Sequence, residues 1–95
     1  MIVVRECFVA KPGLASKLAA QLKDAATAVA GGGTFRVLTD LTGDFNRVFL
    51  EWEAADVADF DARRKAIMVN ETFRAKMNGY TDLYITGSLE LLQIT

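Results

Sequence analysis

Residues 34–54 read TFRVLTDLTGDFNRVFLEWEA and contain two runs of alternating side chains on either side of a glycine. Successive side chains of a strand point to opposite faces, so each run, 34–42 and 46–54, predicts a strand with two distinct faces. Gly43-Asp44, with Asn46 close by, supplies the residue types that favour a tight turn. The stretch therefore predicts an antiparallel hairpin.

A strand and a helix are predicted before this hairpin. Residues 2–10 are rich in Val, Ile and Phe, which predicts a strand that is apolar on both faces, and Lys11-Pro12-Gly13 ends it. From Leu14 to Val29 the apolar residues recur every three or four positions, the pattern of an amphipathic helix. Gly31-Gly32-Gly33 is expected to end this helix, because glycine adopts the left-handed conformation without a Cβ penalty.

After the hairpin, residues 56–78 predict a helix in two pieces, and residues 83–94 predict a last strand. Asp56 is expected to cap the first piece, with Asp59 completing a capping box. Asn70 interrupts the apolar pattern and is expected to cap the second piece after a bend. The expected buried face of the first piece carries Val57, Phe60, Ile67 and Met68.

The order strand-helix-strand-strand-helix-strand predicts one ferredoxin-like α+β domain over residues 1–95, with helices on one face of a four-stranded antiparallel sheet. Large apolar side chains occur on both faces of the strands, so a second sheet is expected to pack on the open face. For a chain of this length, apolar burial of about 145 kcal/mol nearly cancels an ordering cost of about 140 kcal/mol. Both arguments predict a homodimer.

Composition and charge narrow the function classes. Eleven Lys and Arg residues stand against twelve Asp and Glu, a net charge of −1, so no basic excess is present to bind nucleic acid. There is no apolar run of about 18 residues, which argues against a membrane span. The first residues, Met1 to Arg5, lack the order of a signal peptide, and a cytoplasmic location is expected.

The absence of histidine excludes several kinds of site. A Ser-His-Asp triad, histidine-ligated zinc and haem with a proximal histidine all require that residue. The single cysteine, Cys7, lies in an apolar run and is expected to be a buried structural thiol. We therefore expect no cofactor and no metal.

The hairpin, together with Phe60-Asp61-Ala62-Arg63-Arg64 and Asn70-Glu71-Thr72-Phe73-Arg74, resembles the dimeric α+β barrel superfamily, and most closely its NIPSNAP-like members. In that family a hairpin with a central glycine leads into a helix, and an Asp-Pro-Glu-Phe-like step begins a second helical piece. Here Asn70-Glu71-Thr72-Phe73 takes that place without the proline. The resemblance covers nearly the whole chain.

The resemblance implies a homodimer in which two sheets pack face to face into a barrel with the helices outside. The superfamily includes cofactor-free monooxygenases of antibiotic biosynthesis, haem-degrading enzymes, haem peroxidases, isomerases, ligand-sensing domains of regulators and many members with no assigned activity. A shared fold does not select among these functions.

The same resemblance suggests candidate ligand-binding residues. The monooxygenase branch uses Trp, Asn and Tyr to hold aromatic substrates, and Trp52, Asn70, Tyr80 and Tyr84 are the matching residue types in this sequence. Each also has a structural interpretation. Trp52 shares a strand face with Val48 and fits a core position, Asn70 fits a helix cap, and the tyrosines fit the packing of a helix end.

The charged residues of the predicted strands are a second candidate set, namely Arg5, Arg36, Arg47, Glu51 and Glu53. They fit either ion pairs between subunits or a polar cavity that orients an anionic or carbonyl ligand. In the second case Arg36 is the expected cation for a developing enolate or phenolate. Glu51 and Glu53 lie about 6.5–7 Å apart along one strand face, a spacing that suits acid–base work or a metal ion. Residues 63–65, Arg-Arg-Lys, are expected to form a solvated helix face.

These observations predict a homodimer of unassigned activity that binds a small hydrophobic or weakly acidic organic ligand through Arg36, Trp52, Asn70 and Tyr80. The alternative is a cofactor-free monooxygenase or isomerase that acts on a small phenolic or carbonyl compound. A ligand-sensing domain of a regulator ranks third. No residue of the sequence is assigned a catalytic role.

Overall fold

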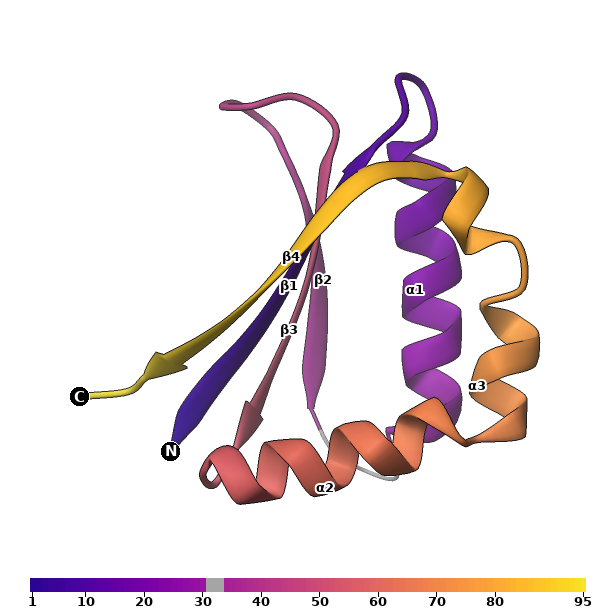
Figure 1. Ribbon diagram of the computed structural model, residues 1–95. Helices are drawn as coiled ribbons and strands as arrows, with labels where there is room; N and C mark the ends of the chain where they lie inside the picture. The colour runs from indigo at the N-terminus through magenta and orange to yellow at the C-terminus, as the bar shows by residue number, and fades with distance from the viewer. Residues whose placement is uncertain (31–33) are drawn as a thin grey trace.

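A computed structural model describes residues 1–30 and 34–95. The elements are β1 (Ile2–Ala10), α1 (Ala15–Val29), β2 (Phe35–Thr39), β3 (Arg47–Ala54), α2 (Val57–Met68), α3 (Glu71–Lys76), a short 3₁₀ helix η1 (Tyr80–Asp82) and β4 (Tyr84–Gln93). The strands form one antiparallel sheet in the order β2-β3-β1-β4, and the helices lie on one side of it (Figure 1). The predicted ferredoxin-like α+β fold is confirmed. The predicted stop at Gly31-Gly32-Gly33 lies outside the described residues.

The strand register separates two faces of the sheet. Phe8 pairs with Val48 and Val4 pairs with Trp52, and these side chains face the helices. Arg5, which pairs with Glu51, points to the other side. That side, the open face, carries Val3, Arg5, Cys7, Arg36, Leu38, Phe49, Glu51 and Leu92. The alternation predicted for both strands of the hairpin is confirmed.

The core of the covered face consists of two clusters. In the first, Leu18, Leu22 and Ala25 of α1 are buried against the sheet, as the apolar stripe predicts. In the second, Phe60 of α2 packs on Val4 and its neighbours in β1 and β3. The helices therefore contact the sheet in two separate places.

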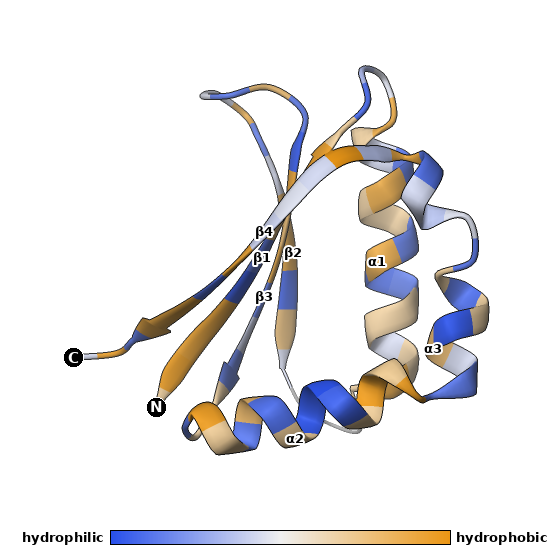
Figure 2. Cartoon of the chain, in the orientation of Figure 1, coloured by the Kyte–Doolittle hydropathy of each residue, from blue (hydrophilic) through white to orange (hydrophobic). Residues whose placement is uncertain are grey.

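The predicted buried face of α2 is wrong in part. Phe60 is buried and Ile67 is half-buried, but Val57 is 59% exposed and Met68 is 58% exposed. Figure 1 gives the reason, because α2 runs across one end of the sheet instead of lying along it. The middle of the helix is hydrophilic, as Figure 2 shows. Such a helix buries a single apolar residue and leaves space beside it.

Side-chain caps fix the start of each piece of this helix. The Asp56 carboxylate accepts a hydrogen bond from the Asp59 N–H at 2.8 Å, and the Asp59 carboxylate accepts one from the Ala55 N–H at 2.9 Å. The Asn70 side-chain oxygen accepts a hydrogen bond from the Phe73 N–H at 2.9 Å. Both predicted caps and the break between the two pieces are confirmed.

The strands of the hairpin are shorter than predicted, because the chain leaves the sheet after Thr39. The Asp40 carboxylate accepts hydrogen bonds from the Arg47 backbone N–H at 3.4 Å and from Arg47 Nε at 3.1 Å, which closes the loop between β2 and β3. Within that loop Gly43 and Asn46 have positive φ angles of 109° and 68°. Glycine and asparagine are the residue types that tolerate such a backbone.

Cys7 was predicted to be a buried structural thiol, but within this chain its side chain is not fully buried. Cys7 is half-buried and lies on the open face, between Phe49 of β3 and Ser88 of β4. An apolar run cannot distinguish the two faces of a strand when large side chains occupy both.

Candidate functional site

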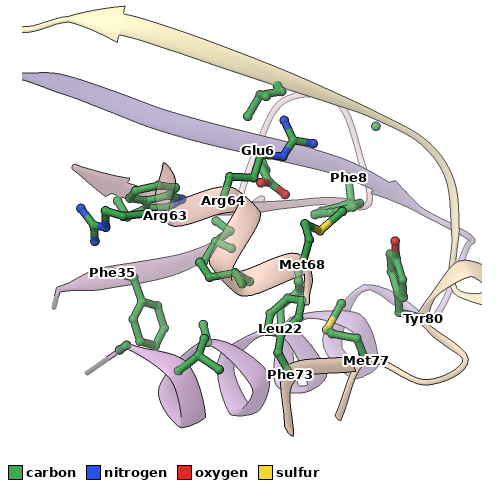
Figure 3. A pocket seen from close by; sticks show the side chains of 18 of the residues that line it. Glu6, Phe8, Leu22, Phe35, Arg63, Arg64, Met68, Phe73, Met77 and Tyr80 are labelled. Atoms are coloured by element: carbon green, nitrogen blue, oxygen red, sulfur yellow. The ribbon is translucent and has the colours of Figure 1, made fainter. Parts of the chain in front are cut away.

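A partly open cavity of about 610 Å³ lies between the covered face of the sheet and the helices. This volume is within the range of small-molecule sites. Its walls are mainly apolar and aromatic, as Figure 3 shows. They include Phe8, Leu22, Leu50, Trp52, Phe73 and Met77.

Small side chains on three elements leave this space open. Ala26 of α1, Ala66 of α2 and Gly87 of β4 all line the cavity. A Cβ atom at Gly87 would lie 3.2 Å from the Cys7 carbonyl oxygen and 3.6 Å from the ring of Phe8. Glycine at this position therefore lets β4 pass close to β1 and leaves Phe8 in place.

Among the residues that the structure describes, Glu6 is the one carboxylate in the cavity wall. It follows Val4 along the covered face of β1, and its cross-strand neighbours are Leu50 and Leu89. Among residues 1–30 and 34–95, no side chain forms a hydrogen bond or ion pair with it. Burial raises the pKa of the Glu6 carboxyl above its ordinary value, and the positive charge of Arg64 partly offsets this rise.

Residues 63–65 are exposed, as the predicted solvated face requires, but Arg63 and Arg64 also line the cavity. The Arg63 guanidinium lies 4.6 Å from the centre of the Trp52 ring and donates a hydrogen bond to the Glu53 carbonyl oxygen at 2.9 Å. The Arg64 guanidinium reaches toward Glu6 in Figure 3. Lys65 lies outside the cavity wall and pairs with Asp61 at 2.9 Å.

Tyr80 and Tyr84 line the cavity together with Phe8. The two tyrosine rings stack with their centres 5.6 Å apart, and Phe8 meets Tyr80 edge to face at 6.5 Å. Burial raises the pKa of the Tyr80 hydroxyl, and Tyr84 and the charge of Glu6 raise it further. The Tyr80 hydroxyl therefore stays protonated at neutral pH and can donate a hydrogen bond into the cavity.

The four predicted ligand-binding residues are not all brought together in one cavity. Trp52 and Tyr80 line the same cavity, but Arg36 and Asn70 do not. Arg36 and Trp52 both line a second, smaller pocket of about 280 Å³. Arg36 lies on the open face, and the Asn70 side chain caps α3. The sequence-based prediction also missed Glu6 and Arg64. The sequence did contain an indication that Glu6 is unusual. At every second position of β1 from Ile2 to Ala10 the residue is apolar, except for the acidic Glu6.

On the open face, Glu51 binds two arginines of its own chain. Its Oε2 accepts a hydrogen bond from Arg5 Nε at 2.6 Å, and its Oε1 accepts one from Arg36 Nη2 at 2.6 Å and one from Arg36 Nε at 2.9 Å. Glu51 is only 6% exposed. Burial by itself would raise the pKa of this carboxyl, but the hydrogen bonds from Arg36 and Arg5 outweigh burial and hold the pKa below its usual range.

These contacts revise the predictions for the charged strand residues. Glu51 has two ion-pair partners within its own chain, and Arg47 likewise pairs with Asp40 at 3.1 Å. A carboxylate that is already bound to two guanidinium groups cannot form an acid–base pair with Glu53. In the part of the chain that the structure describes, no three His, Cys, Asp or Glu residues are placed to hold a metal ion.

Comparisons with solved structures show which proteins share this fold. A NIPSNAP domain protein from Burkholderia xenovorans aligns over 100% of this chain and 95% of its own, with a TM-score of 0.86 and 15% identity. A NIPSNAP family protein from Agrobacterium tumefaciens gives a TM-score of 0.85 at 16% identity and covers 99% of this chain and 92% of its own. A structure described as an antibiotic biosynthesis monooxygenase gives a TM-score of 0.73 at 14% identity and covers 100% of this chain and 99% of its own.

The structural neighbours are thus NIPSNAP domain proteins and antibiotic biosynthesis monooxygenase-like proteins, and the predicted resemblance is confirmed at the level of the fold. No protein-family model matches the sequence, and no curated protein matches it. Over residues 1–30 and 34–95, none of the helices is both long enough and apolar enough to cross a membrane.

Proposed function

We propose that this chain binds a small, flat, hydrophobic or weakly acidic organic molecule in the cavity between the sheet and the helices. The observation that carries the proposal is the cavity itself, about 610 Å³ with mainly apolar walls and few polar groups. Binding sites for small organic molecules have this composition, in which apolar walls supply affinity and a few polar groups fix orientation. Here the polar groups include Glu6, Arg64 and the Tyr80 hydroxyl.

The charges favour a neutral or weakly acidic ligand. The Arg64 guanidinium, for which no ion-pair partner is found among the described residues, would attract an oxygen that carries partial negative charge. The aromatic rings of Phe8, Phe73 and Tyr80 line the cavity and offer apolar surface that a flat molecule can contact. A strongly anionic ligand is disfavoured, because Glu6 would lie beside it.

Thermal shift measurements with 2-naphthol and 2-tetralone, two flat probes of suitable size, test this proposal. At a hundredfold excess over Kd, a ligand that binds only the folded state stabilises it by about 2.7 kcal/mol, so the melting temperature should rise. Ala66→Trp places a large side chain in the cavity wall and should abolish the rise. Ala62→Trp is the matched control, because Ala62 is exposed on the same helix and does not line the cavity. No rise with either probe, or an equal rise in the Ala66→Trp variant, would contradict the proposal.

We further propose that the chain forms a homodimer through the open face of the sheet. The chain exposes 6129 Å², about 700 Å² more than a folded monomer of this mass ordinarily does. Leu38 of β2 and Leu92 of β4 lie on the open face and are each 38% exposed. Phe49 is on the same face of β3, a strand that lies between β2 and β4 in the sheet. An exposed sheet face with this many apolar side chains is typical of an interaction site.

Light scattering tests the dimer and should give twice the chain mass of 10.4 kDa at micromolar concentration. Phe49→Lys would place a charge in the centre of the open face and should shift the protein toward the monomer. Leu41→Lys serves as the control, because Leu41 is 99% exposed in the loop between β2 and β3. A folded monomer at that concentration, before any substitution, would disprove the assembly.

A further inference from the structure

We propose that Glu6 acts as a general base for cofactor-independent proton transfer, and that the substrate class is a flat ketone with an acidic C–H bond beside the carbonyl group. This inference rests on the proposed binding function of the cavity and assigns a reaction to the same site. It is drawn from the placement of Glu6, Arg64 and Tyr80 in a mainly apolar wall.

The first argument is the isolation of the Glu6 carboxylate. Its neighbours across β3 and β4 are Leu50 and Leu89, and no described side chain hydrogen-bonds to it. By contrast, Asp40, Glu51 and the acidic helix caps are each bound to a donor. A carboxylate that is partly desolvated and has no fixed donor is a stronger base than one in water, and it is free to accept a proton from a ligand.

The second argument is the set of polar groups that line the same cavity as Glu6. From α2 come Arg64, whose positive charge acts on Glu6, and Arg63, which is held by the Glu53 carbonyl oxygen and stacks on Trp52. From η1 and β4 come the hydroxyl groups of Tyr80 and Tyr84. The cavity thus holds a base together with a cation and phenolic donors suited to stabilise an oxyanion.

The reaction balances without an oxidant or cofactor. The Glu6 carboxylate takes a proton from the carbon next to the carbonyl group, the C–H bond breaks, and its electron pair forms the C=C bond of an enolate. The negative charge moves to the carbonyl oxygen, where the Tyr80 hydroxyl donates a hydrogen bond and the charge of Arg64 is attractive. Glu6 then returns the proton to the same carbon or to a conjugated one, which restores the carboxylate.

Hydrogen–deuterium exchange at C1 of 2-tetralone in D₂O, followed by proton NMR, measures this step directly. The full chain should accelerate loss of the C1 proton signal above the buffer rate. Glu6→Gln keeps the size of the side chain but removes the base, and it should lower the protein-catalysed rate about 100-fold or more. Glu6→Asp should retain part of the activity. Glu71→Gln, the same change at an exposed position of α3, should leave the rate unchanged.

Binding of 2-tetralone by each variant separates this inference from the proposed function. Binding together with exchange that is lost in Glu6→Gln supports both. Binding without exchange, or exchange that Glu6→Gln does not slow, overturns the role of Glu6 and leaves the binding function in place. Absence of binding overturns the proposed function and this inference with it. The rate should also rise with pH through a transition above the ordinary pKa of a glutamate, and Glu6→Gln should remove that transition.

Discussion

Glu6 and Glu51 lie on neighbouring strands of one sheet and have opposite electrostatic environments. Glu6 faces the cavity between apolar neighbours, and its pKa is raised because burial is only partly offset by Arg64. Glu51 is buried on the open face, and its pKa is lowered because Arg36 and Arg5 bind both of its oxygens. Burial penalises both charges, so the bound partners decide the sign of the shift. The comparison separates a carboxylate that stabilises the fold from one that is available for chemistry.

The largest effect is expected when the ion pairs on the open face are broken. Glu51→Gln leaves Arg5 and Arg36 without a carboxylate and should lower the free energy of unfolding by about 2 kcal/mol at pH 7, the scale of hydrogen bonds to charged groups. Urea denaturation at a fixed protein concentration measures the loss. Glu53→Gln, an exposed position two residues further along β3, should change stability by less than about 0.5 kcal/mol. An equal loss of unfolding free energy in Glu51→Gln and Glu53→Gln would show that the ion pairs of Glu51 with Arg5 and Arg36 do not stabilise the fold.

On the covered face the expected sign is reversed. Glu6→Leu replaces a partly desolvated charge with an apolar side chain beside Leu50 and Leu89 and should raise the free energy of unfolding by about 1 kcal/mol at pH 7. The same urea experiment measures the gain. A clear loss of stability would mean that Glu6 has a stabilising partner, and the contrast between the two glutamates would then be lost.

The pH dependence of stability should distinguish the two carboxyl groups with smaller effects. A folded-state pKa that is lowered, as for Glu51, adds stability above the unfolded-state pKa and loses it as the pH falls through the folded-state value. A folded-state pKa that is raised, as for Glu6, costs stability as the pH rises from the unfolded-state value through the folded-state value.

Denaturation series between pH 4 and pH 8 check both signs. The stability deficit of Glu51→Gln relative to the parent should shrink toward the acid end of the series, because protonation removes the same charge. The advantage of Glu6→Gln over the parent should grow toward the alkaline end. A constant difference across the series for either variant would contradict the corresponding pKa direction.

Most of the fold was predictable because it depends on local pattern. Alternation in residues 34–54, the apolar stripe of residues 14–29 and the caps at Asp56 and Asn70 each determine structure over a few residues. The prediction was wrong where a tertiary contact decided the outcome. β2 ends at Thr39, and the next residue, Asp40, binds Arg47 seven positions away.

The candidate site was less predictable, because a cavity is formed by elements that are distant in sequence. Alternation shows that Arg36 and Phe35 point to opposite faces, but the register that pairs Phe35 with Trp52 depends on the length of the loop between the strands. Arg36 and Trp52 line one small pocket together, but Arg36 does not reach the larger cavity that Trp52 shares with Tyr80. Similarly, Arg64 has the sequence context of a solvated helix residue, and only the crossing of α2 over the end of the sheet brings it near Glu6.

The single buried anchor of α2 has a consequence for how the native state opens. Because Phe60 alone is buried on this helix, its detachment exposes far less apolar surface than global unfolding does. Amide protons of α2 should therefore exchange with deuterated solvent through a local opening, whereas those of β1, paired on both sides, should exchange only when the whole domain unfolds. The helix that contributes Arg64 to the cavity is thus the element best suited to let a ligand in and out.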